Sequence, residues 1–171
     1  MIAGVNQCRI VICYGHHGEC FMAGRVLRKS GQQFAAVPLA QQGDQVWIML
    51  LTSRGTGRWV LPKGWAEQDL TGPEVAAKEA FEEAGLMGEV QPDSLGTYCY
   101  LKEMPQAQAV PCQVEVFAMW VDQQLDDWPE RAQRVRQWFP LSEAATKVQE
   151  DDLRLLLESL AKQGRLQRPS T

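Results

Sequence analysis

The stretch TGPEVAAKEAFEEAGL, which begins at Thr71, constrains this chain more than any other. Thr71 is followed three residues later by Glu74, which is the spacing of a capping box. Pro73 falls in the first turn, and Gly85 follows the last apolar position. These signals predict a helix over about residues 72–84.

The predicted helix has two different faces. Because a helix turns by about 100° per residue, the carboxylates of Glu79, Glu82 and Glu83 project onto one face. Glu74 projects away from them, where its role is the cap. The other face is apolar and mostly small, which suits a helix lying close against a sheet: Ala76, Ala77, Ala80, Phe81 and Ala84.

Three neighbouring carboxylates repel one another, and their pKa values would rise unless a cation neutralises them. Mg²⁺ is suited to this task because it prefers carboxylate and water oxygens and often shares them with substrate phosphates. The alternative interpretation is a solvated, glutamate-rich helix face.

The longer stretch GRWVLPKGWAEQDLTGPEVAAKEAFEEAGL resembles the box of the Nudix hydrolase family. Gly64 fits the first glycine of that box, and residues 78–86 fill its last part in register. Two positions depart, because Leu70 replaces the first glutamate and Lys78 replaces an arginine. Lys78 keeps the charge but loses the bidentate fork that would orient a carboxylate. Neither change alters the Glu-x-x-Glu-Glu core, so we expect metal binding to be retained, with weaker contacts to orient the metal-binding carboxylates.

The resemblance implies an active site built on the box. Mg²⁺ or Mn²⁺ would be held by three glutamates and one backbone carbonyl, and one glutamate would act as the base or orient it: Glu79, Glu82, Glu83 and the carbonyl of Lys63. Family members also vary in taking a catalytic acid from outside the box. Here Glu103 and Glu130 are both candidates.

Two further stretches, TSRGTGRWVLPKGW and WPERAQRVRQWF, are similar to one branch of the family, the diphosphoinositol polyphosphate and diadenosine polyphosphate hydrolases. Arginine suits such substrates because its fork matches two phosphate oxygens. The alternative is a soluble surface with scattered arginines. The substrate-binding candidates are Ser53, Arg54, Arg58, Arg134 and Arg136.

The function that the resemblance implies is a metal-dependent pyrophosphohydrolase. It would cleave a phosphoanhydride bond in a nucleoside diphosphate-linked or polyphosphorylated small molecule, of the diadenosine polyphosphate or diphosphoinositol polyphosphate type. The alternative is a non-catalytic Nudix-fold module that binds a phosphorylated ligand. All three core glutamates are present, which favours the enzyme.

Strand and helix signals predict an α/β/α sandwich with a mixed sheet. Strand patterns occupy residues 32–40, 45–53, 59–62, 95–103, 112–121 and 136–141, and helical patterns occupy 142–148 and 151–162. The first two strands are expected to form a hairpin. Pro38 lacks an amide donor, so its strand is expected at a sheet edge or with a bulge.

Length and charge set further limits. The 171 residues suit one domain, here 31–164, between an N-terminal extension, 1–30, and a C-terminal tail, 165–171. A net charge of −4 argues against bulk nucleic-acid binding. We see no membrane-spanning run or signal peptide, and we expect a cytoplasmic protein acting on a small molecule. The sequence leaves the oligomeric state open.

The N-terminal extension contains the ligand-rich stretch CRIVICYGHHGEC: Cys8, Cys13, His16, His17 and Cys20. The number of ligands would suffice for zinc, but their spacing is poor because the cluster lacks a distant second half. A disulfide is another interpretation, although reduced thiols are the default in the cytoplasm. We favour a poorly ordered extension, and interpret Cys99 and Cys112 as buried apolar side chains.

Overall fold

The computed structural model describes residues 11–13, 20–22, 25–27, 31–103, 109–163, 166 and 168. Its main sheet has the strand order β10-β5-β4-β9-β8, with β6 beside β5 and β7 beside β4. The strands of this sheet are β4 (Gly31–Gln42), β5 (Gln45–Thr52), β6 (Trp59–Val60), β7 (Lys63–Trp65), β8 (Leu86–Glu103), β9 (Ala109–Gln124) and β10 (Arg136–Pro140).

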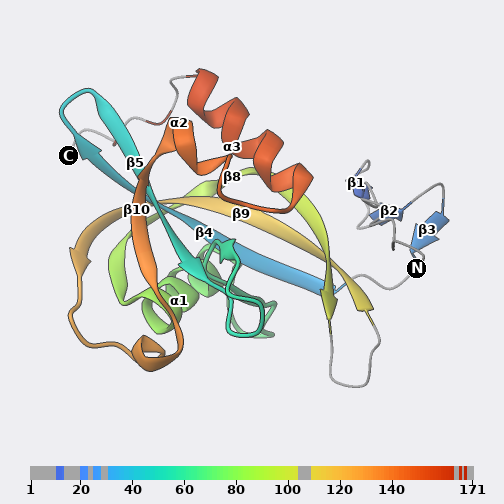
Figure 1. Ribbon diagram of the computed structural model, residues 1–171. Helices are drawn as coiled ribbons and strands as arrows, with labels where there is room; N and C mark the ends of the chain where they lie inside the picture. The colour runs from blue at the N-terminus through green and yellow to red at the C-terminus, as the bar shows by residue number, and fades with distance from the viewer. Residues whose placement is uncertain are drawn as a thin grey trace, which may run out of the picture.

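The sheet lies between two helical layers (Figure 1). Helix α1 (Gly72–Ala84) covers one face, and α2 (Leu141–Ala144) and α3 (Asp151–Gln163) cover the other. Strands β4 and β9 run parallel, whereas the other neighbouring pairs are antiparallel. The predicted α/β/α sandwich with a mixed sheet is therefore confirmed.

Alternation along β4 divides the core into two parts, since successive side chains point to opposite faces. Val37 and Leu39 pack in the cluster that contains Leu157 of α3. Ala36 packs instead in the cluster that contains Ala80 of α1. Each helical layer is thus anchored by its own set of strand residues.

The predicted strands and the hairpin between β4 and β5 are present, but the expectation for Pro38 was wrong. β4 lies inside the sheet, between β5 and β9. Pro38 is tolerated because β4 changes partner there. On one side, strand β4 pairs with β7 up to Ala35 and with β5 from Leu39 onward. The missing amide donor therefore falls in the gap between the two ladders.

Helix α1 begins and ends where the sequence predicts. The Glu74 carboxylate accepts hydrogen bonds from the amide and the hydroxyl of Thr71, each at 2.7 Å. Gly85 ends the helix with φ = 62°, a left-handed conformation that glycine adopts without steric cost.

The buried face of α1 is even smaller than expected. Val75, Ala76, Ala80 and Ala84 are buried, together with Glu83. Phe81, which we assigned to the apolar face, is 39% exposed. The helix therefore contacts the sheet almost entirely through methyl-sized groups.

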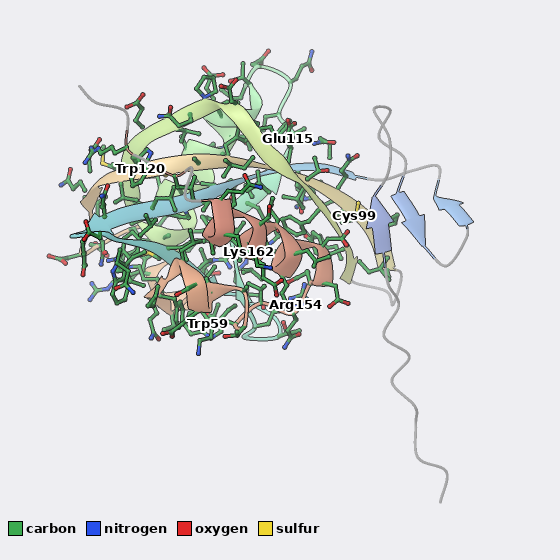
Figure 2. The ribbon with its side chains drawn as sticks, turned by 90° about the horizontal axis from the view of Figure 1, so that it is seen from above. Trp59, Cys99, Glu115, Trp120, Arg154 and Lys162 are labelled. Atoms are coloured by element: carbon green, nitrogen blue, oxygen red, sulfur yellow. The ribbon has the colours of Figure 1, made fainter. Side chains whose placement is uncertain are left out.

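Helix α3 lies across the other face of the sheet, and Figure 2 shows Arg154 and Lys162 on it. Its buried residues are Leu153, Leu157 and Leu160. The described part of the chain contains no helix with the length and apolar character needed to cross a membrane.

The N-terminal prediction lies mostly outside the described residues. Within 1–30 the structure describes β1 (Val11–Cys13), β2 (Cys20–Met22) and β3 (Arg25–Leu27), which pair as a small antiparallel sheet. Cys8, His16 and His17 are not described. Cys99 and Cys112 are both buried, as predicted, but Cys99 is also disulfide-bonded, whereas Cys112 is free.

Candidate active site

A cavity of about 490 Å³ opens where α1, the β5–β6 turn and strands β7 and β8 meet. The three predicted metal-binding glutamates, Glu79, Glu82 and Glu83, line it together with Lys63 and Gly64. The predicted substrate ligands Ser53, Arg54, Arg58 and Arg134 line it as well. Segments far apart in the sequence thus bring carboxylates and cations to one cavity.

Glu83 is the most buried of the acids, with 8% of its surface exposed. One carboxylate oxygen accepts a hydrogen bond from the backbone amide of Lys63 at 3.1 Å, and the other pairs with Arg134. Burial raises the pKa of Glu83, and the charges of Arg134 and Lys63 partly oppose that rise. These contacts fix the carboxylate at the wall of the cavity.

Glu79 depends on Gly64, the first residue of the box. A Cβ atom at Gly64 would lie only 1.9 Å from Oε1 of Glu79, so any side chain there would displace the carboxylate. Burial raises the pKa of Glu79 to about 7, and the neighbouring charges of Glu83 and Glu82 add to the effect. The glycine is therefore needed for the close approach of α1 to β7.

Lys63 contributes its side chain to the cavity in addition to its backbone. Its ammonium group lies 5.5 Å from the centre of the Tyr100 ring. Desolvation lowers the pKa of this amine, although the charges of Glu83 and Glu150 oppose that change. The lysine therefore places a cation beside the carboxylates, inside the cavity.

The donor set suits a hard divalent cation, because it consists of carboxylates whose mutual repulsion such an ion would relieve. In the described part of the chain, no three metal-binding side chains already converge on one point. The reason lies in their contacts. Glu83 is turned toward Arg134, and Glu79 toward Gly64. A bound ion would therefore compete with Arg134 for Glu83.

The segment from Leu125 to Arg136, here called the clamp loop, holds the C-terminal end of α1. The last carbonyls of a helix have no partner within it. The clamp loop supplies four donors to four successive carbonyls. The amide of Glu130 donates to the carbonyl of Glu82 at 3.1 Å, and the indole of Trp128 donates to the carbonyl of Glu83 at 3.2 Å. Arg136 donates to the carbonyl of Ala84, and the amide of Leu125 donates to the carbonyl of Gly85 at 2.8 Å.

The clamp loop also brings Glu130 and Arg134 to the cavity. Arg134 pairs with both Glu83 and Glu130 and donates to the carbonyl of Thr52 at 3.0 Å. Glu130 in turn pairs with Arg54 at 3.2 Å. Of the two acids proposed from outside the box, Glu130 thus lies in the cavity, whereas the side chain of Glu103 is not among those described.

The β5–β6 turn presents the remaining predicted ligands. Ser53 and Thr56 share a hydrogen bond of 2.8 Å, which closes the turn, and Arg54 stands 59% exposed at its tip. Arg58 pairs with the buried carboxylate of Glu150 at 3.4 Å and leaves its Nε without a protein partner.

Arg136 is placed differently from the other predicted arginines. It is not among the described residues that line the cavity. Its guanidinium donates to the carbonyls of Ala84 and Leu125 and stacks on the Trp128 ring, 3.7 Å from the ring centre. With these contacts it supports α1 rather than facing the space where a substrate would bind.

The sequence interpretation missed one wall of the cavity, formed by residues of β4, β7 and β8: Gln33, Trp65, Tyr100, Leu101 and Lys102. Trp65 directly follows the box glycine, and strand alternation puts Tyr100 and Lys102 on one face of β8. These two signals would have been enough to find part of the wall.

Comparison with known families agrees with this geometry. The NUDIX domain family matches residues 29–159, which include every element of the main sheet and the whole box. The chain belongs to the Nudix family. The resemblance to the Nudix family is therefore confirmed, and the match covers most of the chain.

Several curated Nudix proteins are similar in sequence. The chain is 33% identical over 108 residues to "Nudix hydrolase 16, mitochondrial" of Arabidopsis thaliana, covering 61% of this chain and 59% of that protein. It is 30% identical over 112 residues to "Diphosphoinositol polyphosphate phosphohydrolase 3-alpha" of Mus musculus, covering 64% and 63%. The chain thus matches between half and two thirds of the length of these relatives.

Solved structures share the fold at lower identity. A C. elegans Ap4A hydrolase superposes with a TM-score of 0.56 at 15% identity, covering 78% of this chain and 98% of that one. The NUDIX domain of Shewanella oneidensis NrtR, solved with ADP-ribose, superposes with a TM-score of 0.58 at 14% identity, covering 80% and 90%. At this identity the likeness establishes the architecture of the Nudix fold.

Proposed function

We propose that this Nudix protein is a metal-dependent pyrophosphohydrolase. Its substrate would be a nucleoside diphosphate-linked or polyphosphorylated small molecule, of the diadenosine polyphosphate or diphosphoinositol polyphosphate type. One observation supports this most. Three carboxylates of one helix share a single cavity with three arginines from two loops. Phosphoryl transfer needs both kinds of group, carboxylates for metal ions and cations for phosphate oxygens.

The metal ligands in this proposal are Glu79, Glu82, Glu83 and the carbonyl of Lys63, with Mg²⁺ or Mn²⁺ as the ion. A bound divalent ion lowers the pKa of a coordinated water and neutralises charge on the phosphoryl group. A contact of Glu83 supports its assignment, because its carboxylate accepts a hydrogen bond from the backbone amide of Lys63, the residue whose carbonyl is the proposed fourth ligand. Glu79 faces the same strand at Gly64.

Glu130 is the proposed acid from outside the box, since it lies in the cavity on the clamp loop. Its carboxylate is held between Arg54 and Arg134. A carboxylate in this position would accept a proton or orient a water molecule near the scissile bond. Arg54, Arg58 and Ser53 would bind phosphate oxygens.

The alternative remains a non-catalytic module that binds the same ligands. A panel assay with Mg²⁺, Mn²⁺ or EDTA separates the two. It would contain diadenosine polyphosphates, diphosphoinositol polyphosphates, nucleotide sugars, ADP-ribose and nucleoside triphosphates. The enzyme is expected to release phosphate or mononucleotide with the metals and not with EDTA. Binding of a panel member without any turnover under all conditions would support the module. Cytoplasmic location stays a prediction.

A further inference from the structure

Glu150 is a buried acid that the proposed mechanism does not use. Only 7% of its side chain is exposed, and it is not among the described residues that line the cavity. Its carboxylate pairs with Arg58, which does line the cavity, with 3.4 Å between Oε1 and Nη2. Burying two charges is costly, and their attraction repays that cost only in good geometry. The pair is therefore a poor source of stability, which points to another role.

The contact between Arg58 and Glu150 uses only part of the atoms that could form it. Nε of Arg58 and Oε2 of Glu150 are both buried, and neither has a hydrogen-bond partner among the described residues. Nε and Nη2 form one edge of the guanidinium, and such an edge matches the two oxygens of a carboxylate. The two unpartnered atoms are therefore the ones that would complete a bidentate contact. This edge of Arg58 is directed toward Glu150.

Arg58 is also held by contacts other than Glu150. Its backbone carbonyl accepts a hydrogen bond from the amide of Ser53 at 2.8 Å, across the β5–β6 turn. Its guanidinium carbon lies 5.8 Å from the centre of the Tyr100 ring, which also lines the cavity. The side chain nevertheless stays 26% exposed. Arg58 is thus fixed by the protein and keeps surface that a ligand in the cavity can contact.

The backbone around Glu150 is fixed on both sides. Glu150 directly precedes α3, and its carbonyl accepts a hydrogen bond from the amide of Arg154 at 2.9 Å. Two residues earlier, Val148 forms an isolated parallel bridge with Trp59, which Figure 2 labels. Because Trp59 follows Arg58, this bridge brings the connection between α2 and α3 to the base of the β5–β6 turn. The Glu150 carboxylate therefore starts from a fixed place beside Arg58.

We propose that Glu150 is a positioning residue, whose carboxylate holds the Arg58 guanidinium in the cavity where it binds a phosphate group of the substrate. The inference rests on the proposed function and adds to it a residue from outside the box and the clamp loop. An arginine that is fixed beforehand loses less side-chain freedom when it binds a phosphate. The negative charge of Glu150 acts the other way, because it repels a polyphosphate. In this proposal the positioning effect is the larger of the two.

Binding of inorganic tripolyphosphate in EDTA tests the proposal without metal or turnover. In isothermal titration of the whole chain, Glu150→Gln is expected to weaken binding by about 2- to 12-fold, because the ligand must then immobilise Arg58. If Glu150 acted only through its charge, the same change would strengthen binding. With Arg58→Ala already present, Glu150→Gln should no longer weaken binding. Glu143→Gln is the matched control, since this exposed acid is not among the described cavity residues and should change the affinity less than about twofold.

The mobility of Arg58 can also be measured without a ligand. Heteronuclear NMR would follow its Nε–Hε signal, which is identified by its loss in Arg58→Lys. The order parameter of this group should be about 0.85 in the wild type and should fall below about 0.6 in Glu150→Gln. A role of Glu150 in stability alone would lower the free energy of unfolding and leave both the affinity and this order parameter of the folded protein unchanged.

Several results would overturn the proposal. These are unchanged or stronger tripolyphosphate binding by folded Glu150→Gln, the same weakening with and without Arg58, no binding to the wild type, or an Arg58 signal that stays equally rigid in Glu150→Gln. Failure of the proposed function looks different. If no panel member is hydrolysed with Mg²⁺ or Mn²⁺ but Glu150→Gln weakens binding only when Arg58 is present, the hydrolase fails and the positioning role stands.

Discussion

Helices α1 and α3 have thirteen residues each and lie on opposite faces of one sheet, yet they meet it in different ways. Helix α1 presents Ala76, Ala80 and Ala84, whereas α3 presents leucines. The distance between packed elements depends on the side chains at the contact. Small residues let α1 approach β7 closely, which brings Glu79 to Gly64 and Glu83 to the amide of Lys63.

The comparison shows that the two helices have different roles, one in stability and one in positioning the site. Each buried leucine of α3 contributes about 1.5–3 kcal/mol through burial. Helix α1 gains less from its methyl groups and in addition buries the charged Glu83, which is costly. The clamp loop compensates by supplying donors to the end of α1 and Arg134 to Glu83. Helix α3 therefore mainly stabilises the fold, and α1 mainly positions the site.

The largest effect on stability is expected for Leu157→Ala in α3. Leu157 is fully buried, so the cavity left behind should lower the free energy of unfolding by about 2–5 kcal/mol. Urea unfolding followed by circular dichroism measures it. The kcat of the folded fraction should not change, since no residue of α3 is among those lining the cavity. Leu155→Ala is the control, because Leu155 is 56% exposed and should change stability by less than about 0.5 kcal/mol.

The largest effect on activity is expected for Glu83→Gln in α1. Loss of a charged metal ligand should lower kcat/KM by at least about a hundredfold, or about 2.7 kcal/mol. Circular dichroism should show a folded variant, because Arg134 keeps its contact with Glu130. Glu74→Gln, at the other end of the helix, should leave kcat/KM unchanged. Near-normal turnover by a folded Glu83→Gln variant would refute the site assignment.

Ala80→Leu tests whether α1 must lie close to the sheet. Ala80 is fully buried in the core cluster under α1, so the added carbons should destabilise the fold by about 1–3 kcal/mol. Activity should fall as well, because the helix would be pushed away from Gly64. Ala77→Leu is the matched control, since Ala77 is only partly buried. If Ala80→Leu lost stability but kept full kcat/KM, close packing would not be what positions the carboxylates.

Much of the fold could be predicted because local signals agree with one another. The cap at Thr71, the left-handed Gly85 and the leucine spacing of α3 are encoded within a few residues, and each was found. Pro38 was misjudged because its place depends on partners distant in sequence. Whether a proline is tolerated depends on which neighbour pairs at that residue, and β4 has two neighbours on that side.

The candidate site was predictable to the extent that it follows a linear motif. The three box glutamates and the predicted ligands Ser53, Arg54 and Arg58 all line the cavity. Arg136 was grouped with Arg134 because both lie in the arginine-rich stretch that carries the resemblance. Arg134 precedes β10 and pairs with Glu83 and Glu130, whereas Arg136 donates to the carbonyls of Ala84 and Leu125. The pairing of Arg58 with Glu150, and the contribution of Lys102, require tertiary contacts that no local pattern reveals.

A smaller effect is expected for Arg136→Lys, which keeps the charge but cannot reach two carbonyls at once. Loss of one such hydrogen bond should lower the free energy of unfolding by about 0.5–1.5 kcal/mol. If Arg136 positions α1, kcat/KM should fall by the same factor for every substrate. A substrate ligand would instead affect long polyphosphates most, which is the expectation for Arg54→Ala. A selective loss with Arg136→Lys on diadenosine hexaphosphate relative to ADP-ribose would return Arg136 to the substrate-binding set.

The smallest expected effect is a pH dependence of stability that comes from Glu79. Its pKa is raised from 4.5 to about 7, chiefly by burial and then by the charge of Glu83. Between pH 4.5 and about pH 7 the Glu79 carboxyl holds a proton in the native state and releases it in the unfolded state. The contribution of this carboxyl to the free energy of unfolding is therefore fully present below about pH 4.5 and is lost as the pH rises through about 7. In EDTA, Glu79→Gln should therefore gain stability relative to the wild type from about pH 5 to about pH 8. Partial exposure of Glu79 keeps the gain small.

The cause of that dependence can be tested in the same experiment. Because the charge of Glu83 helps to raise the pKa of Glu79, the effect of Glu79→Gln on stability should shrink when Glu83→Gln is also present. Chemical unfolding at each pH measures all four proteins of this double-mutant cycle. A stability difference between wild type and Glu79→Gln that stays constant over this range would show that Glu79 is not desolvated against the sheet. The electrostatic part of the comparison between α1 and α3 would then not hold.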